Sequence, residues 1–377
     1  MPEKYETVYP NILIVDDEKG IRDILRAFIN ISGYSCETVG SLREAQNKME
    51  GKLFDIIFLD LNLEDGYGMD FIEKVLNENS DAIIVIVSGI PESKILVESI
   101  QNGAFDYVEK PFNLNNFHEK FESIIIEWRY RYLTKQYQLK FKDIFENYIK
   151  KKEINSKETR YEDFLNNSDV IIKPINNFIE KLNLPFPETR SHRERLASLC
   201  KLSGRKIGLK EESIMVLKYG AYLHDIGMSL EPSTILENPG LLSDDEIKLL
   251  KRHPITGFSI VERFPFFDKV SRLILHHHEW YNGDGYPIGL SEDTIPIEAR
   301  IFSIIDAFDS MIIGRPYKKK MSYSETIKEL RRSKGKQFDP LVVDTFVQIP
   351  EETINIIYIK KSTEEESYVT KNQHSND

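Results

Sequence analysis

The chain has few cysteines, no excess of basic residues and no long apolar run, and each absence excludes a class of protein. Its two cysteines, Cys36 and Cys200, lie in unrelated segments, which argues against a disulfide framework and a cysteine-ligated metal site. The net charge of −11 argues against a protein that binds the phosphate backbone of DNA. Apolar runs such as residues 82–87 are far shorter than the roughly 20 residues of a membrane span. The amino-terminal segment lacks a signal-peptide pattern, so we expect a cytoplasmic protein with no membrane span and no DNA partner.

What the chain does have is enough length for more than one core. Its 377 residues, 41% hydrophobic and 29% charged, are ordinary for globular protein and too many for one typical domain. We predict a multidomain protein with an amino-terminal domain over residues 8–122, a helical connector over 123–164 and a second domain over 165–360. Residues 361–377 are polar without periodicity, and we expect a disordered tail there.

Short apolar runs alternate with helical patterns in the first domain, and each run ends in polar residues. Continuous apolar runs of this kind indicate a parallel sheet covered on both faces, whose working residues lie beyond the carboxyl ends of the strands. Three carboxylates at one edge repel one another unless a cation holds them, and an oxygen-rich site suits Mg²⁺. The strand-end residues are Asp16 and Asp17 after residues 11–15, Asp60 after 55–59, Ser88 after 82–87, and Lys110 after 105–108.

This order resembles a response-regulator receiver domain over the whole of residues 8–122. The resemblance implies a flavodoxin-like α/β fold with a five-stranded parallel sheet, and Asp60 as the acceptor of a phosphoryl group from a histidine kinase. It also implies a cis peptide bond before Pro111. The remaining residues that it implies are Asp16, Asp17 and the Asn62 carbonyl as Mg²⁺ ligands, with Ser88, Tyr107 and Lys110 as switch residues.

The connector carries an apolar stripe at intervals of three and four residues, which predicts a helix with one apolar face. Such a face serves either ordinary packing within the chain or a dimer whose helices transmit a change in register. We expect a homodimer and keep ordinary packing as the alternative. Residues 150–161 are polar and predict a hinge or loop. The stripe consists of Ile126, Tyr130, Leu133, Tyr137, Phe141, Ile144 and Tyr148.

Histidines gather in the second domain. The chain has eight, and all but His118 and His374 lie between residues 192 and 278. Three are consecutive, at 276–278, and His224 precedes Asp225 in an apolar context, where a polar group needs a partner or a metal. Nitrogen and carboxylate ligands without cysteine suit iron, manganese or zinc. Two such ions about 3.5–4 Å apart can attack a phosphodiester, so the pattern predicts a multinuclear hydrolytic site.

The pair His224-Asp225, together with Gly285-Tyr286-Pro287, resembles an HD-GYP domain, a family that hydrolyses cyclic di-GMP. Segments around residues 192–195, 238–254, 295–301, 315–318 and 338–340 agree with the family pattern. The resemblance implies an all-α HD-type phosphohydrolase fold with His224 and Asp225 as catalytic residues. The implied ligands of two or three divalent metals, iron being preferred over manganese or zinc, are Glu188, His192, His224, Asp225, His253, His277, His278 and Asp306.

Other residues have a role and an alternative. Glu188 is either a ligand of a third metal or a carboxylate outside the ligand shell. Arg315 and Lys318 match a basic pair that binds the phosphates of the substrate, although a solvated basic loop fits them too. Tyr286 and Pro287 shape a loop beside the guanine pocket, and in other family members this loop also contacts diguanylate cyclases. We interpret His276 as a packing or outer-shell histidine and Asp309 as structural.

One position departs from the family pattern. The family usually has a lysine three residues after the HD aspartate, and this chain has Met228 there. A lysine near such a site stabilises developing negative charge, so its loss weakens transition-state binding. We predict a response regulator whose phosphorylation controls hydrolysis of cyclic di-GMP to pGpG and, after a second cut, GMP. The alternatives are a weak or inactive module that senses cyclic di-GMP or docks onto a cyclase, and a phosphohydrolase of another nucleotide.

Overall fold

The computed structural model describes residues 8–89, 93–111, 113–151, 168–182, 189–230, 240, 243–264, 267–314 and 319–359. The chain divides into two compact units, Met1–Leu133 and Thr134–Asp377, and each is described by itself. The predicted loop at 150–161 lies almost entirely outside the described residues, as does the predicted tail at 361–377. The predicted domain boundaries stay a prediction.

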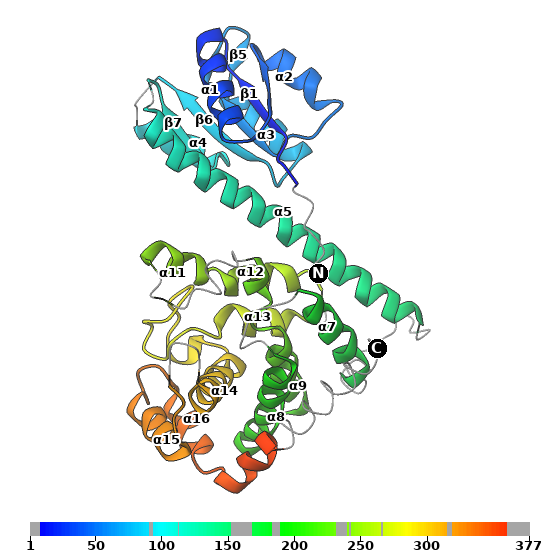
Figure 1. Cartoon of the computed structure of the whole chain (residues 1–377), viewed down its shortest axis with the longest axis vertical. Helices are drawn as coiled ribbons and strands as arrows, with labels where there is room; N and C mark the ends of the chain where they lie inside the picture. Colours follow the sequence, from blue (N-terminus) through cyan, green and yellow to red (C-terminus); the bar gives the residue numbers. More distant parts are fainter. Residues whose placement is uncertain are drawn as a thin grey trace. The chain divides into compact units, whose positions relative to one another are not determined.

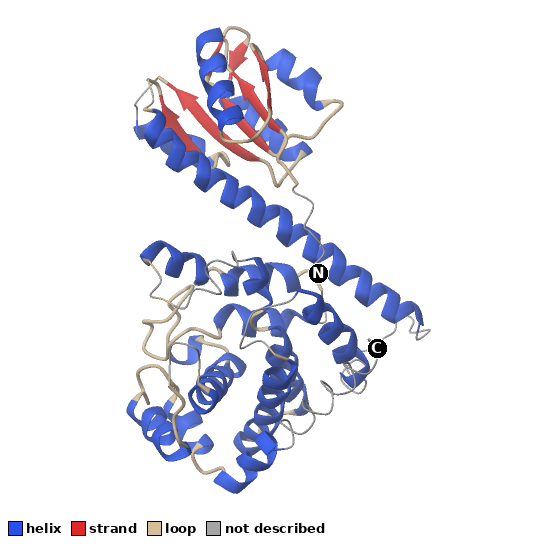
Figure 2. Cartoon of the chain, in the orientation of Figure 1, coloured by secondary structure: helices blue, strands red, loops and turns tan. Residues whose placement is uncertain are grey.

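The first unit is built on a five-stranded parallel sheet with the strand order β2-β1-β3-β6-β7. Figure 2 shows these strands flanked by helices, and the predicted α/β fold is confirmed. A separate antiparallel pair, β4 with β5, follows β3. The elements are β1 Ile12–Val15, α1 Lys19–Ile31, β2 Cys36–Val39, α2 Leu42–Met49, β3 Ile56–Leu59, β4 Asn62–Leu63, β5 Gly66–Tyr67, α3 Met69–Glu78, β6 Ile83–Ser88, α4 Ser93–Gln101, β7 Asp106–Glu109 and α5 Leu114–Lys151.

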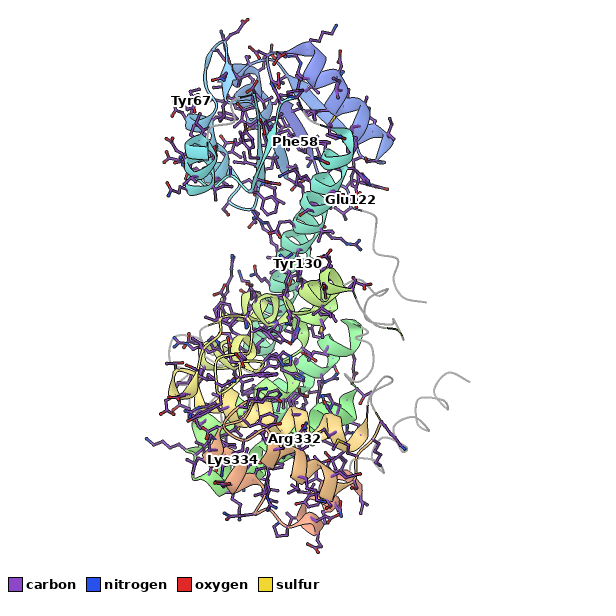
Figure 3. All side chains as sticks on the ribbon, turned by 90° about the vertical axis from the view of Figure 1, so that its left-hand side faces the viewer. Phe58, Tyr67, Glu122, Tyr130, Arg332 and Lys334 are labelled. Atoms are coloured by element: carbon purple, nitrogen blue, oxygen red, sulfur yellow. The ribbon has the colours of Figure 1, made fainter. Side chains whose placement is uncertain are left out.

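The central strands are apolar throughout because helices cover both faces of the sheet. Every residue of β1, β3 and β6 is buried, the pattern of a parallel sheet covered on two sides. One face packs on α1 and the start of α5, where Phe58 of β3 meets Phe117 and Phe121. The other face packs on α2 and α3. Figure 3 labels Phe58 inside this unit and the exposed Tyr67 at its edge.

The predicted connector helix exists as the later part of α5, and its apolar stripe is divided between buried and exposed positions. Tyr137 and Phe141 are buried in the second unit. The Phe141 ring lies 5.8 Å from Phe178 and 4.9 Å from Phe264, measured between centroids. Ile126, in contrast, is 43% exposed. Ordinary packing within the chain therefore accounts for part of the stripe, and the predicted dimer stays a prediction.

The described residues of the second unit are helical apart from loops and two isolated β-bridges, at Asn282–Ser291 and Lys334–Phe338. This confirms the predicted all-α class. Helices α8, α9, α12, α13 and α14 pack on one another, as Figure 1 shows. The elements are α7 Ser168–Leu182, α8 Arg190–Ile207, α9 Glu211–Leu223, η1 Ile226–Leu230, α11 Asp244–Leu250, α12 His253–Val261, α13 Asp268–His276, η3 Glu292–Thr294, α14 Ile297–Ile313, α15 Tyr323–Arg332 and α16 Pro340–Phe346.

A further helical stretch, residues 351–359, ends the described part of the second unit. None of the helices in the described ranges combines the length and the apolar character that crossing a bilayer requires.

Candidate functional site

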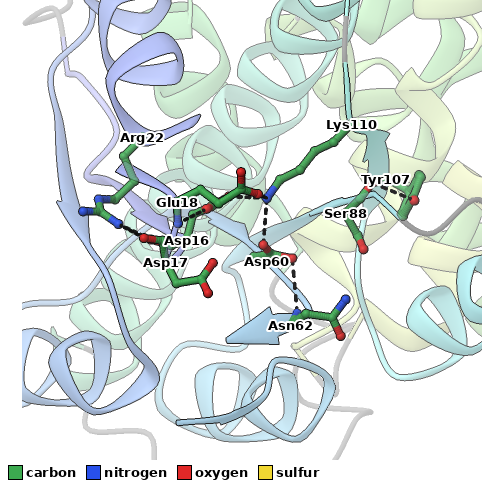
Figure 4. Close-up of polar contacts among 9 residues, drawn as sticks. All are labelled: Asp16, Asp17, Glu18, Arg22, Asp60, Asn62, Ser88, Tyr107 and Lys110. Atoms are coloured by element: carbon green, nitrogen blue, oxygen red, sulfur yellow. Dashed lines mark hydrogen bonds and ion pairs between the residues drawn. The ribbon is translucent and has the colours of Figure 1, made fainter. Parts of the chain in front are cut away.

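Three carboxylates meet at the carboxyl edge of the sheet in the first unit. Asp16 and Asp17 follow β1 directly, and Asp60 follows β3. Each offers an oxygen within 4.8 Å of the others. Because β1 and β3 are adjacent parallel strands, their ends place these acids side by side, as Figure 4 shows. Such an oxygen-only group of ligands suits Mg²⁺.

Lys110, which follows β7, reaches across to the acids. Its Nζ lies 2.7 Å from Asp16 Oδ2, 2.7 Å from Asp60 Oδ2 and 3.2 Å from Glu18 Oε1. Burial alone would lower the pKa of Lys110, but the hydrogen bonds and charges of Asp16 and Asp60 raise it above its usual range. Burial raises the pKa of Asp16, and Lys110 offsets part of that rise. The lysine thus carries the positive charge that the crowded acids need.

The remaining strand-end residues surround Asp60. The Asn62 backbone N–H donates to Asp60 Oδ1 over 3.2 Å. Ser88 is fully buried at the end of β6, and the Tyr107 hydroxyl donates to the Ser88 carbonyl over 3.0 Å. Figure 4 shows these contacts. The Lys110–Pro111 peptide bond is cis, as the resemblance implied.

In the second unit, Asp225, His253, His277 and His278 form one possible set of metal ligands. Each offers one ligand atom within 4.8 Å of the others. Asp225 follows α9, His253 begins α12, and His277 and His278 follow α13. Between these elements there is no room for a side chain at Gly227, where a Cβ atom would lie 2.1 Å from the His253 carbonyl oxygen. Glycine at this position lets η1 and α12 approach closely enough to bring the ligands together.

Backbone carbonyls orient two of these imidazoles. His253 Nδ1 lies 2.6 Å from the Leu250 carbonyl oxygen, and His277 Nδ1 lies 2.7 Å from the Ile274 carbonyl oxygen. A carbonyl only accepts hydrogen bonds, so Nδ1 carries a proton in both rings, and Nε2 is the ring atom left to face Asp225 or a metal. The two Nε2 atoms lie 3.3 Å apart. A metal bound by both Nε2 atoms would displace any proton that they hold.

His192, His224 and Asp306 form a second set, again with ligand atoms within 4.8 Å of one another. They come from α8, the end of α9, and α14. The Thr189 side chain caps α8 by accepting a hydrogen bond from the His192 N–H over 3.2 Å. This cap fixes the first turn of α8, which carries His192.

Asp225 joins the two sets. Its Oδ1 lies 3.2 Å from His253 Nε2 and 3.7 Å from His277 Nε2, and its Oδ2 lies 3.4 Å from His224 Nε2. Burial alone would raise the pKa of Asp225, but His224, His253 and His277 lower it well below its usual range. An ionised carboxylate with one oxygen toward each set is the geometry of a bridging ligand.

The donor atoms fit divalent metals. Among the described residues, none donates a hydrogen bond to two buried carboxylate oxygens, Asp225 Oδ1 and Asp306 Oδ1, although buried polar atoms normally have a partner. Burial lowers the pKa of His277, and lowers the pKa of His278 well below its usual range. Both imidazoles are therefore neutral near pH 7, the form that binds a metal. Nitrogen and oxygen donors of this kind suit iron, manganese or zinc.

A loop beside the metal ligands carries Tyr286. Its ring stacks on the His278 ring with centroids 4.8 Å apart, and its N–H donates to the His278 carbonyl over 3.1 Å. A Cβ atom at Gly285 would lie 2.1 Å from the backbone nitrogen of Trp280, so only glycine fits there. The Lys251 Nζ lies 5.3 Å from the centroid of the Tyr286 ring. The loop therefore brings an aromatic ring to the rim of the site, and Lys251, at the end of α11, brings a cation to that ring.

Sequence reasoning did not identify Glu279, which is 2% exposed. Its carboxylate accepts hydrogen bonds from the N–H groups of Ile288, Gly289 and Leu290, at 2.8 to 3.2 Å. A buried carboxylate that accepts several hydrogen bonds from backbone N–H groups holds a loop in one conformation. The feature of the sequence that could have indicated Glu279 is its position directly after the three histidines.

The structure brings the described predicted ligands together in two groups, and three further predicted residues lie outside its described part. His192, His224 and Asp306 form one group, and the other four described ligands form the second. His276, interpreted as a packing or outer-shell residue, has its Nδ1 3.8 Å from Glu279 Oε1. The residues outside the described part of the chain are Glu188, Arg315 and Lys318.

Each of the two units contains a segment that matches a known protein family. Residues 12–122 match the response regulator receiver domain family, and residues 176–342 match the HD domain family. A receiver domain protein of Methanospirillum hungatei with a solved structure is 28% identical, covering 32% of this chain and 97% of that one, with a TM-score of 0.31.

Some relatives match most of the chain, and others match only part of it. A cyclic di-GMP phosphodiesterase of Thermotoga maritima is 28% identical over 359 residues, 95% of each chain. The cyclic di-GMP phosphodiesterase response regulator RpfG of Xanthomonas campestris is 26% identical, covering 90% of this chain and 87% of the relative. The 3'3'-cGAMP-specific phosphodiesterase 2 of Vibrio cholerae is 33% identical over 171 residues, 45% of this chain and 33% of the relative.

The position of Asp225 between the two sets generates a prediction about metal binding. With Mg²⁺ in excess to fill the acidic site of the first unit, Mn²⁺ titrated into the metal-free protein should bind at two sites. Asp225→Asn should weaken both by more than about 100-fold, because a ligand is worth at least as much as its outer-shell partner. Asp306→Asn should weaken one. Calorimetry measures both affinities.

The matched control for this prediction is Asp344→Asn, which removes an exposed carboxylate paired with Lys334 and should change neither affinity. If Asp225→Asn weakens the same single site as Asp306→Asn, Asp225 does not bridge.

Proposed function

Since residues 12–122 form a response regulator receiver domain and residues 176–342 form an HD domain, we propose that the chain is a response regulator whose phosphorylation controls metal-dependent hydrolysis of cyclic di-GMP. The observation that carries the proposal is the pair of histidine and carboxylate sets joined by Asp225. Relatives that match most of the chain are named cyclic di-GMP phosphodiesterases. The proposed products are pGpG and, after a second cut, GMP.

The residues divide the chemical work. Two metals of this kind supply Lewis acidity to the phosphodiester and its leaving oxygen. Asp225 would offer one oxygen to each metal, and uncharged imidazoles such as His277 and His278 would supply further ligands without adding negative charge that repels the phosphates. Tyr286 and Pro287 offer a flat face for a guanine base. Arg315 and Lys318 bind the phosphates in this proposal, and Glu188 holds a third metal.

The first unit supplies the control in this proposal. A histidine kinase phosphorylates Asp60, with Mg²⁺ held by Asp16, Asp17 and the Asn62 carbonyl. Lys110 already contacts Asp60 and would pair with the phosphoryl oxygens instead, since a phosphoryl group brings more negative charge than the carboxylate. Ser88 and Tyr107 respond to that change.

The proposal extends to two protein partners. We propose a homodimer that uses the exposed part of α5, where Ile126 is 43% and Leu139 is 51% exposed. We also propose that the loop of Tyr286 and Pro287 contacts diguanylate cyclases.

The test of the proposed activity is product analysis. Protein purified without oxygen and loaded with Fe²⁺ or Mn²⁺ should convert cyclic di-GMP to pGpG or GMP. The His224→Ala, Asp225→Ala double variant should form no product. Tight binding of cyclic di-GMP without product, in protein that holds its full metal complement, would contradict the enzyme and support a sensor.

The same assay should also test 3'3'-cGAMP as a substrate. A relative specific for 3'3'-cGAMP shares 33% identity with part of this chain, and Met228 stands where a lysine is usual. Faster hydrolysis of 3'3'-cGAMP than of cyclic di-GMP would replace the proposed substrate while leaving the reaction type in place.

Met228 generates a prediction about rate. It lies in η1, and its N–H donates to the Asp225 carbonyl over 2.9 Å, so a lysine there sits three residues from the bridging ligand. Met228→Lys should raise kcat by about 10²–10³, the worth of one donor to developing charge, with a small effect on KM. Met228→Leu, which adds no charge, is the control. An unchanged kcat in a folded, metal-loaded Met228→Lys protein would show that this charge does not limit the reaction.

Asp60 generates a prediction about control. Incubation with acetyl phosphate and Mg²⁺ should add one phosphoryl group to the protein and change its rate of cyclic di-GMP hydrolysis. Asp60→Asn should abolish both effects, because the acceptor oxygen is gone. Gel retardation of the phosphoprotein measures the first effect. Asp65→Asn, which alters an exposed acid bonded to the start of α2, should still be phosphorylated. Phosphorylation of the Asp60→Asn protein would place the acceptor elsewhere.

A further inference from the structure

The carboxylate of Asp309 is a buried junction of four hydrogen bonds. It lies on α14, three residues after the ligand Asp306, and is 1% exposed. Arg195 binds it through two nitrogens, Nε to Oδ1 over 2.9 Å and Nη2 to Oδ2 over 3.0 Å. His192 Nδ1 lies 2.8 Å from Oδ2. The Tyr358 hydroxyl donates to Oδ1 over 2.7 Å.

The hydrogen bonds of this junction need an ionised Asp309 carboxylate and a protonated Tyr358 phenol. Burial alone would raise the pKa of Asp309, but His192 and Arg195 lower it below its usual range, so the carboxylate is ionised. Burial and the Asp309 charge raise the pKa of Tyr358 above its usual range, so the phenol keeps its proton. With Asp309 ionised, His192 donates from Nδ1 and directs the Nε2 lone pair away from Asp309.

The tyrosine comes from far along the chain. Tyr358 lies in the helical stretch 351–359, 49 residues after Asp309. Besides its hydrogen bond, its ring faces the Arg195 guanidinium, whose carbon lies 5.6 Å from the ring centroid. The end of the described chain therefore contacts both groups that hold the His192 imidazole in place.

We propose that Tyr358 is a positioning residue for the metal held by His192, His224 and Asp306, acting through Asp309. The proposal rests on the metal centre of the proposed function and deepens it. Without the tyrosine hydroxyl, Asp309 Oδ1 keeps the Arg195 bond as its one hydrogen bond from the described residues. The carboxylate, still bound by Arg195 at both oxygens, can then turn more easily about its Cβ–Cγ bond. The His192 ring turns with it, because both share the Oδ2 contact. A ligand with more freedom binds its metal more weakly.

The other ligand set does not depend on this junction. His253 and His277 are oriented by the carbonyls of Leu250 and Ile274, each three residues earlier on the same segment. Neither bond involves Asp309 or Tyr358. Loss of the tyrosine hydroxyl should therefore act on one metal and spare its neighbour, whereas a general loss of stability would weaken both.

The experiment uses the full-length protein, stripped of transition metals and held in excess Mg²⁺, with Mn²⁺ as the probe. His192→Ala and His253→Ala identify which binding step belongs to which ligand set. Tyr358→Phe removes only the hydroxyl. It should weaken the Mn²⁺ affinity of the binding step that His192→Ala abolishes by about 10-fold, the smallest loss typical of changes to residues that hold a metal ligand in place. Asp309→Asn should weaken the same step by up to about 100-fold. The step lost in His253→Ala should not change.

Tyr323→Phe is the matched control. The Tyr323 hydroxyl donates to the Ile349 carbonyl over 3.1 Å, and its ring packs beside Phe308 of the same helix α14. Its loss removes one tyrosine hydrogen bond without touching Asp309, so both Mn²⁺ steps should keep the wild-type affinity.

Electron paramagnetic resonance shows directly whether both Mn²⁺ sites are filled in the same molecule. Two Mn²⁺ ions that share a carboxylate give a spin-coupled electron paramagnetic resonance signal, and one ion alone gives an isolated signal. At an Mn²⁺ concentration that just fills both wild-type sites, Tyr358→Phe should show more of the isolated signal, and Tyr323→Phe should not.

Three results overturn the proposal. Equal weakening of both steps in Tyr358→Phe would assign the residue to general stability, and unchanged affinities would show that Arg195 alone fixes Asp309. If the wild-type protein binds no Mn²⁺ beyond its Mg²⁺ site, the metal centre itself is wrong, and the proposed function fails with it.

Discussion

A carboxylate that is removed from water must be compensated, and Asp225 is compensated by imidazoles from separate segments of the second unit. His224 precedes it directly, His253 begins α12, and His277 follows α13. Its charge therefore requires three helices to end or begin at one point. The glycine at 227 allows the close approach of η1 and α12 that this convergence needs. Much of the packing of the unit follows from satisfying one buried group.

The two units compensate their clustered carboxylates in different ways. In the first unit the acids extend from the ends of parallel strands, and one lysine, Lys110, lies between Asp16 and Asp60. In the second unit imidazoles separate the acids, and ring nitrogens of His224, His253 and His277 face Asp225. A permanently charged lysine suits a site where one anionic group can replace another beside it, because its positive charge is always present. Neutral nitrogen donors suit a site whose positive charge is brought by bound metals.

Sequence patterns predicted the fold and indicated which residues could form the candidate site, because both depend on local features. Continuous apolar strands that end in acids specify a parallel sheet with a charged edge, and adjacent strands bring Asp16 and Asp60 together without further information. The histidine run and the His224-Asp225 pair showed where metals could bind. They did not show that the ligands divide into two sets with Asp225 between them, since that depends on how α8, α9, α12 and α14 cross.

Contacts made over long sequence distances were not predictable. Asp309 looked structural, because nothing near it in the sequence indicates a bond to His192, 117 residues earlier. No sequence pattern indicates a contact for Tyr358, because that contact depends on where residues 351–359 pack in the folded unit. Glu279 could be mistaken for one more solvated acid, since burial is a property of the folded loop and not of the residue type. Part of the connector stripe was explained by ordinary packing, because Phe178 and Phe264, distant in sequence, supply its partners.

The hydrogen bonds from Ile288, Gly289 and Leu290 to Glu279 have a consequence for ligand binding. Ile288 is 58% exposed, and an exposed loop of this kind normally samples many shapes and must lose that freedom when a ligand binds. Here one buried carboxylate has already removed much of the freedom, so binding beside Tyr286 involves little further loss of conformational entropy. A ligand that bound beside Tyr286 would meet a rigid surface, and selectivity would depend on the fit of that surface more than on closure around the ligand.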